Sequence, residues 1–217
     1  MAARKHQATK KVKPDQLFGS KGVFYKLPQG AEGPMEIRFD FSQISPPDKY
    51  YYADCLHLRV DEEMRMAILA FGHRNENTDK FSDRIDVVMP TNSLFGVFCA
   101  SATPVEEAVD KILQASGTSV DLRPLIPTET EAPTLFANII FAAAGDGESS
   151  LDFYHLSPRE VHLAKTQRTD MEIEATVRVI MSTVLTKYFF NVLRPHAQRI
   201  TYNQPILERN TSVARAR

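Results

Sequence analysis

The chain has 217 residues, 43% of them hydrophobic and 24% charged, with a formal net charge of −1 at pH 7. This much apolar material can bury a core, which excludes disorder along the whole chain. The longest apolar run, around residues 139–144, is far shorter than the roughly 20 residues of a membrane-spanning helix. The first residues also lack the apolar segment of a signal peptide. We therefore expect a cytoplasmic protein that does not enter a membrane.

The near-zero charge hides a basic N-terminus. Five basic residues precede the first acidic residue: Arg4, Lys5, Lys10, Lys11 and Lys13. A short basic arm on an acidic body can bind nucleic acid, but it can equally be a solvated terminus. We predict that residues 1–16 and 204–217 are disordered tails.

Strand patterns dominate the first half of the chain. Residues 35–41 alternate between apolar and charged, and residues 50–60 and 65–72 predict two further strands. The polar stretch 73–83 predicts a loop, and residues 85–89 a short fourth strand.

The pattern then changes to that of helices. Thr91 or Asn92 is placed to cap a first helix, and residues 103–106 (Thr-Pro-Val-Glu) are typical of a capping box at the start of a second. Gly117 is placed to end that helix.

The second half begins after a proline-rich stretch, residues 117–134, which has the composition of a linker. Residues 135–144 are apolar on both faces, as expected of a strand that lies centrally in a sheet or against another subunit. A turn at 145–147 predicts that residues 149–156 return as the antiparallel partner.

A second capping box, Ser157–Glu160, precedes the last strand and helix. Residues 171–181 alternate for so long that one strand face must be solvated or meet a polar partner. Ser182 and Thr183 are placed to cap the final helix.

The two halves correspond in order. Tyr52-Ala53-Asp54 matches Phe136-Ala137-Asn138, Ala70-Phe71 lies near Asp152-Phe153 when the halves are compared, and residues 88–91 match 180–183. We predict an α+β fold with antiparallel sheets and helices packed on one face, built from two related strand-hairpin-helix units. The predicted organisation is a basic tail (1–16), a first unit (17–116), a linker (117–134), a second unit (135–203) and a C-terminal tail (204–217).

Each half resembles a short bacterial domain family that we group with the SecB-like export chaperones. The resemblance rests on Tyr52-Ala53-Asp54 and Phe136-Ala137-Asn138, and on the strand ends Met89-Pro90 and Met181-Ser182. It covers roughly residues 50–113 and 135–200 and brings no catalytic residues. It implies oligomerisation and binding of extended polypeptide.

Motifs for catalysis or cofactor binding do not occur in the sequence. The nine glycines form neither a phosphate-binding loop nor a dinucleotide fingerprint. Cys55 and His57 share a strand face, but no second pair of ligands follows at zinc-like spacing. Asp152, His155 and His162 can be drawn as an acid–base cluster, although polar residues around a turn are the simpler interpretation. We expect no enzymatic activity, no cofactor and no metal.

The aromatic content of the helices exceeds what one small helix needs to bury. We predict a partner-binding surface, either a subunit interface or a client groove, whose candidate residues are Phe95, Phe98, Phe141, Leu185, Tyr188, Phe189 and Val192. The alternative is that all of these side chains pack on the protein's own sheet.

The leading functional hypothesis is a SecB-like chaperone or oligomeric scaffold that binds polypeptide through apolar helix faces and a strand edge. The runner-up is a nucleic-acid-associated accessory protein that uses the basic arm. An enzyme with an unfamiliar motif is the third hypothesis.

Overall fold

The computed structural model describes residues 24–25, 45–75, 80–120, 125, 127, 131–145, 147–160, 162 and 171–203. The predicted strand 35–41 and both predicted tails lie outside the described residues. The backbone alone is described for 24–25, 80, 171–172 and 200–203.

The first of two four-stranded sheets is built mainly from the first half of the chain. Strands β3 (Cys55–Asp61), β4 (Met66–Asn75) and β5 (Lys80–Pro90) form an antiparallel meander. Strand β6 (Thr134–Phe136), from the second half, adds to the far edge in parallel with β5.

The second sheet repeats this plan. Strands β7 (Ile139–Ala144), β8 (Glu148–His155) and β10 (Glu174–Ser182) form the meander. Strand β2 (Tyr50–Ala53), from the first half, adds in parallel with β10. A separate pair joins β1 (Phe24–Tyr25) to β9 (Met171–Glu172).

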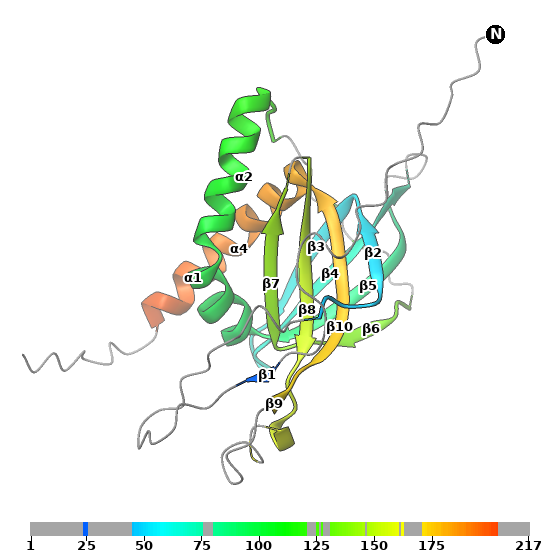
Figure 1. Cartoon of the computed structure of the whole chain (residues 1–217), viewed down its shortest axis with the longest axis vertical. Coiled ribbons are helices and arrows are strands. Elements are labelled where there is room, and N and C mark those ends of the chain that lie inside the picture. Colours follow the sequence, from blue (N-terminus) through cyan, green and yellow to red (C-terminus); the bar gives the residue numbers. More distant parts are fainter. Residues whose placement is uncertain are drawn as a thin grey trace, which may run out of the picture.

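The helices gather on one side of the sheets, next to β7 (Figure 1). A π-helix, η3 (Asn92–Phe98), runs into the short α1 (Cys99–Ser101) and then α2 (Thr103–Ser116). Helix α4 (Thr183–Asn203) follows β10 and contacts α2, η3 and β3. The predicted α+β class with two related strand-hairpin-helix units is therefore confirmed, with one parallel strand added to each antiparallel meander.

Two predicted strands are each divided between the two sheets. The expected strand 50–60 breaks at Asp54 into β2 and β3, and the expected strand 135–144 breaks at Ala137 and Asn138 into β6 and β7. The prediction that 135–144 lies centrally is wrong, because β6 and β7 are both edge strands. Hydrophobic alternation reports which residues face a core, and it continues unchanged where a strand passes from one sheet to another.

Each break is held by the side chain of an Asx residue. Asp54 Oδ1 accepts the backbone N–H of Arg74 at 2.6 Å, and Asn138 Oδ1 accepts that of Leu156 at 2.8 Å. An Asx side chain that bonds nearby backbone can replace the ladder bonds lost where the strand bends.

The polar stretch 73–83 is mostly strand, which corrects the predicted loop. Strand β4 continues to Asn75 and β5 begins at Lys80, with a register shift after Phe71. Asp83, at this irregularity, has a positive φ of 44°. Backbone hydrogen bonds extend the β4–β5 hairpin into residues whose side chains are polar. A prediction based on polar composition therefore ended the first strand too early and began the second too late.

Some of the predicted helix caps are confirmed and others are wrong. Ser157 accepts the Glu160 N–H at 3.1 Å, Ser182 accepts the Leu185 N–H at 3.1 Å, and Gly117 ends α2 with φ 64°. The capping box at Thr103 is wrong, because α2 is capped by Ala102, which is itself helical and makes no side-chain bond. Thr91 also makes no side-chain cap bond. In both places the residue before the helix already has a right-handed helical backbone, Thr91 with φ −57° and Ala102 with φ −86°, and not the extended backbone that such a cap requires.

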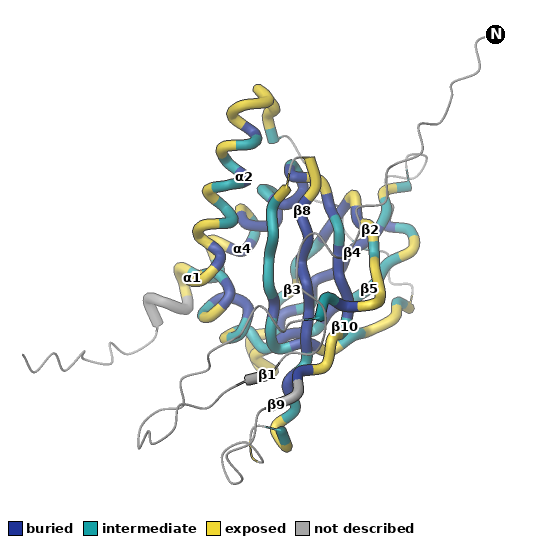
Figure 2. Tube along the Cα trace, in the orientation of Figure 1, coloured by how far each residue is buried: buried dark blue, intermediate teal, exposed yellow. Residues whose placement is uncertain are grey.

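The core lies between the two sheets and under the helices (Figure 2). At its centre Phe71 of β4 meets Phe153 of β8 edge to face, with ring centroids 5.8 Å apart. Both side chains are fully buried. Met89 and Met181, at the ends of the third strand of each meander, are also buried in this core.

Candidate functional site

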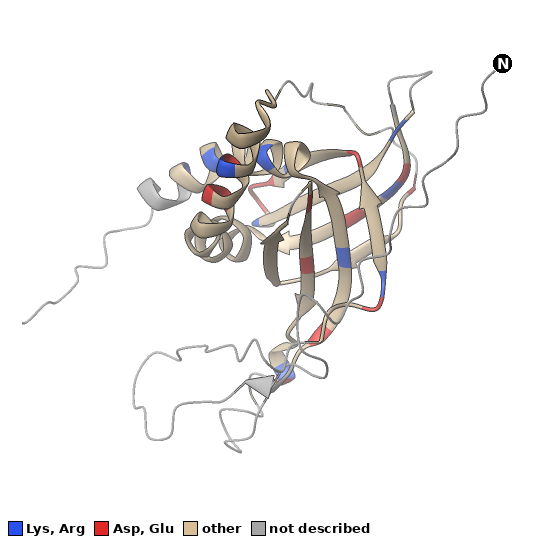
Figure 3. Ribbon diagram, turned by 45° about the horizontal axis from the view of Figure 1, so that its top comes forward, with Lys and Arg blue, Asp and Glu red and all other residues tan. Residues whose placement is uncertain are grey.

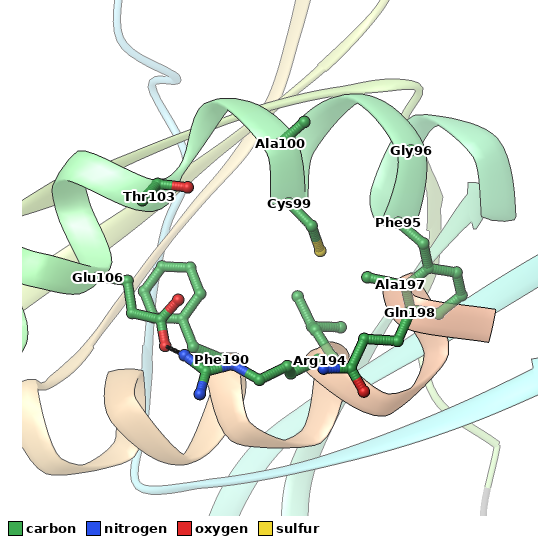
Figure 4. Close-up of a pocket in the computed structure, with 11 residues that line it drawn as sticks. Phe95, Gly96, Cys99, Ala100, Thr103, Glu106, Phe190, Arg194, Ala197 and Gln198 are labelled. Carbon is green, nitrogen blue, oxygen red and sulfur yellow. Dashed lines mark hydrogen bonds and ion pairs between the residues drawn. The ribbon is translucent and has the colours of Figure 1, made fainter. Parts of the chain in front are cut away.

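A groove runs between the η3–α1 segment and helix α4. Its volume is about 690 Å³, and it is partly open to solvent. Figure 4 shows the side chains that line it. Cys99 and Ala100 line one wall, and Arg194, Ala197 and Gln198 line the other. Small side chains on both walls keep the space between the helices unfilled.

The floor of the groove is aromatic and aliphatic. Phe95, Phe190 and Leu193 line it with side chains that are almost fully buried. Phe95 stacks on His196 of α4 at 5.3 Å between ring centroids, and Phe190 stacks on Phe98 at 6.2 Å. These contacts join the two walls, so the groove is preformed and not dependent on a bound ligand.

The thiol of Cys99 points into this space (Figure 4). Burial, assisted by the charge of Glu106, raises its pKa to about 11. The thiol therefore stays protonated at neutral pH and is a small apolar lining group and not a nucleophile.

A network of charges closes one end of the groove. Glu106 pairs with Arg194 and accepts a hydrogen bond from Lys187 Nζ at 3.2 Å. Lys187 also lies 2.8 Å from an oxygen of Asp110. Acidic and basic residues therefore alternate across α2 and α4 (Figure 3), and they hold the two helices at a set spacing.

The structure divides the seven predicted partner-binding residues. Phe95, Phe98, Leu185 and Phe189 are buried inside this one chain, the arrangement that the sequence left as the alternative. Phe141, Tyr188 and Val192 are partly buried and keep some exposed surface.

The groove walls were not predicted from the sequence. Ala100, Ala197 and Arg194 belong to no motif, and only the packing of two helices far apart in sequence brings them together. The available signal was the small residues at 99–100 and 197, on two helices that were both predicted.

Cys55 and His57, the residues considered for metal binding, lie in buried or partly buried positions of β3. Burial raises the pKa of Cys55 to about 12 and lowers the pKa of His57 below its ordinary value. Within the part of the chain that the structure describes, no group of three or more His, Cys, Asp or Glu side chains could hold a metal ion.

Asp152, the acid of the possible acid–base cluster, forms a buried ion pair with Arg178. Both of its carboxylate oxygens accept bonds from Arg178, each at 2.6 Å, across the β8–β10 register. Hydrogen bonding to Asp152 raises the pKa of Arg178. Asp152 is thus the polar partner that the alternation of 171–181 required.

The five basic residues proposed for nucleic-acid contact, Arg4, Lys5, Lys10, Lys11 and Lys13, lie outside the described residues. Among the helices that the structure describes, none is long and apolar enough to cross a membrane. Comparison with protein-family models, with curated proteins and with solved structures finds no match to this chain.

Proposed function

We propose that this protein is a non-catalytic polypeptide-binding protein of the cytoplasm and that the groove between η3–α1 and α4 is its recognition site. The observation that carries the proposal is the combination of an apolar floor with a charged end in an open, preformed groove of about 690 Å³. Clefts of this size and chemistry are the usual sites of apolar recognition in proteins.

The shape of the groove favours a segment of polypeptide as the ligand. Two helices with small facing residues leave a trough into which an apolar side-chain row can fit, as in helix-in-groove recognition. Val97, on the same helix η3, is a large apolar residue that is 62% exposed. Arg194, 55% exposed at the charged end, can pair with an acidic group of the ligand.

The resemblance to SecB-like domains implies the same kind of client and adds oligomerisation. We propose a homo-oligomer on this basis. Phe141 and Tyr188 are the predicted residues that retain exposed surface for such a contact.

The test compares two Ala→Arg variants on exposed helix positions. Ala100 lines the groove, whereas Ala115 lies on α2 outside it, and both are exposed, so neither change disturbs the core. The ligand is a reduced and alkylated, permanently unfolded polypeptide, and binding is followed by fluorescence anisotropy. We expect Ala100→Arg to weaken binding at least about tenfold, because a long charged side chain fills the trough, and Ala115→Arg to change it less than about twofold.

Equal melting temperatures of the two variants show that the fold is intact. The proposal is wrong if the wild type does not bind at micromolar concentration, or if Ala100→Arg binds as tightly as Ala115→Arg.

A further inference from the structure

The two sheets correspond residue by residue. In the first sheet Phe71 pairs with Leu56 on one side and Ile85 on the other. In the second sheet Phe153 pairs with Ile140 and Val177 in the same way. The pairing of the second strand with the third shifts register next to this phenylalanine in both sheets: β5 passes from Ile85 to Ser82 while β4 passes from Phe71 to His73, and β10 passes from Val177 to Ala175 while β8 passes from Phe153 to Tyr154.

The parallel strands correspond as closely. Tyr52 of β2 lies opposite Ile180, and Phe136 of β6 lies opposite Val88. The residue before each strand also makes the same bond: Arg178 N–H donates to the Lys49 carbonyl, and Asp86 N–H donates to the Pro133 carbonyl, both at 2.9 Å.

The Asx residue after each parallel strand makes an equivalent pair of bonds. Asp54 N–H donates to the Gly72 carbonyl at 3.1 Å, and Asn138 N–H donates to the Tyr154 carbonyl at 3.0 Å. Their side chains then accept the N–H two residues further along the same strands, at Arg74 and Leu156. Ala53 and Ala137, which precede them, are both buried at the bend.

In each case the strand has crossed to the other half. Strand β2 belongs by sequence to the first half but pairs with β10, and β6 belongs to the second half but pairs with β5. Phe71 and Phe153, which occupy equivalent positions, touch at the centre between the sheets. An isologous contact of this kind is what a two-fold axis between two copies of one unit produces.

We infer that this chain is a fused, strand-exchanged dimer: each half lends the strand that precedes its meander, β2 or β6, to complete the sheet of the other. The edges of β5 and β10 are therefore strand-accepting surfaces. The partner that each one fits is a short extended segment with an aromatic residue, then Ala, then Asp or Asn, supplied by the other copy of the unit. Such exchange is a low-cost route from monomer to dimer, and it leaves each half one strand short when it is alone.

The test uses the full chain with a protease site inserted between Val120 and Leu125 and with the native cysteines replaced by alanine. Cysteine pairs are introduced on the outer sheet faces in four versions. Two pairs span the exchanged strands, Tyr52→Cys with Ile180→Cys and Phe136→Cys with Val88→Cys. Two control pairs span the unexchanged alternative, Tyr52→Cys with Val88→Cys and Phe136→Cys with Ile180→Cys.

Each folded protein is treated with a short thiol-specific cross-linker, dibromobimane, then cleaved and separated on a denaturing gel. Strand exchange predicts that the two fragments remain joined in the first two versions and separate in both controls, since each control pair lies within one fragment. Separated fragments in the exchange versions would overturn the inference. So would a cross-linked product of twice the chain mass, because the strands would then be exchanged between molecules and not within one.

Discussion

The buried pair formed by Asp152 and Arg178 offers a demanding test of how the second sheet is stabilised. Their side chains are only 5% and 4% exposed, and each oxygen of Asp152 takes one guanidinium N–H. Asp152→Ala leaves an uncompensated guanidinium in a low-dielectric site, which costs about 3–5 kcal/mol. For a chain of this length that is a fall in melting temperature of roughly 6–20 °C.

The measurement is the free energy of unfolding by chemical denaturation, followed by circular dichroism, for Asp152→Ala and for a double variant. Arg178→Met with Asp152→Leu removes both charges and keeps the volume, so we expect it to be within about 1 kcal/mol of wild type. Asp86→Ala is a matched control in the pair Arg84–Asp86, whose side chains are 15% and 17% exposed. It should cost about 1 kcal/mol. The reasoning is refuted if Asp152→Ala costs no more than this control, or if the double variant is as unstable as the single.

Three further predictions concern the helices and the first sheet. Phe189→Asp should abolish cooperative melting, because Phe189 is fully buried, whereas Tyr188→Asp at a partly exposed neighbour should fold; equal solubility and melting of the two would contradict this. Gly117→Ala should lower the free energy of unfolding by about 1 kcal/mol, since φ is 64° there, and a stabilised variant would count against the left-handed cap. The pKa of His57 is lowered by burial from its ordinary 6.5, so below pH 6.5 the unfolded chain binds the proton first and stability falls. His57→Gln should flatten that fall in denaturation curves between about pH 6.5 and 5, and an unchanged slope would show that His57 does not contribute to it.

Much of the fold follows from local patterns in the sequence. Apolar patterns and turn residues located the meander strands, and Gly117, Ser157 and Ser182 mark element ends by chemistry that depends only on near neighbours. The correspondence of Tyr52-Ala53-Asp54 with Phe136-Ala137-Asn138 also identified the two related units.

What the sequence could not show is where the chain changes sheets. Asp54 and Asn138 bend the strand by bonding to Arg74 and Leu156, and these partners lie about 20 residues away in sequence. The same limit applies to the candidate site. Ala100 and Ala197 line the same groove only because α4 packs against η3 and α1, and an alanine on either helix has no signature of its own.

An apolar helix stripe does not by itself distinguish a protein core from a partner-binding surface. Phe98 and Phe189 form an apolar helix stripe that fits a core and an interface equally well, and the structure buries both within one chain. The proposed recognition surface is formed by the small residues beside them, which leave the groove unfilled.

The most direct test of the proposed function is hydrogen–deuterium exchange of the full chain with and without the permanently unfolded polypeptide. The account predicts slower exchange in peptides that cover residues 92–103 and 190–198, the two walls of the groove, with little change in the Tyr50–Ala53 and Thr134–Phe136 strands. No change on the groove walls, or protection confined to those two strands, would contradict it.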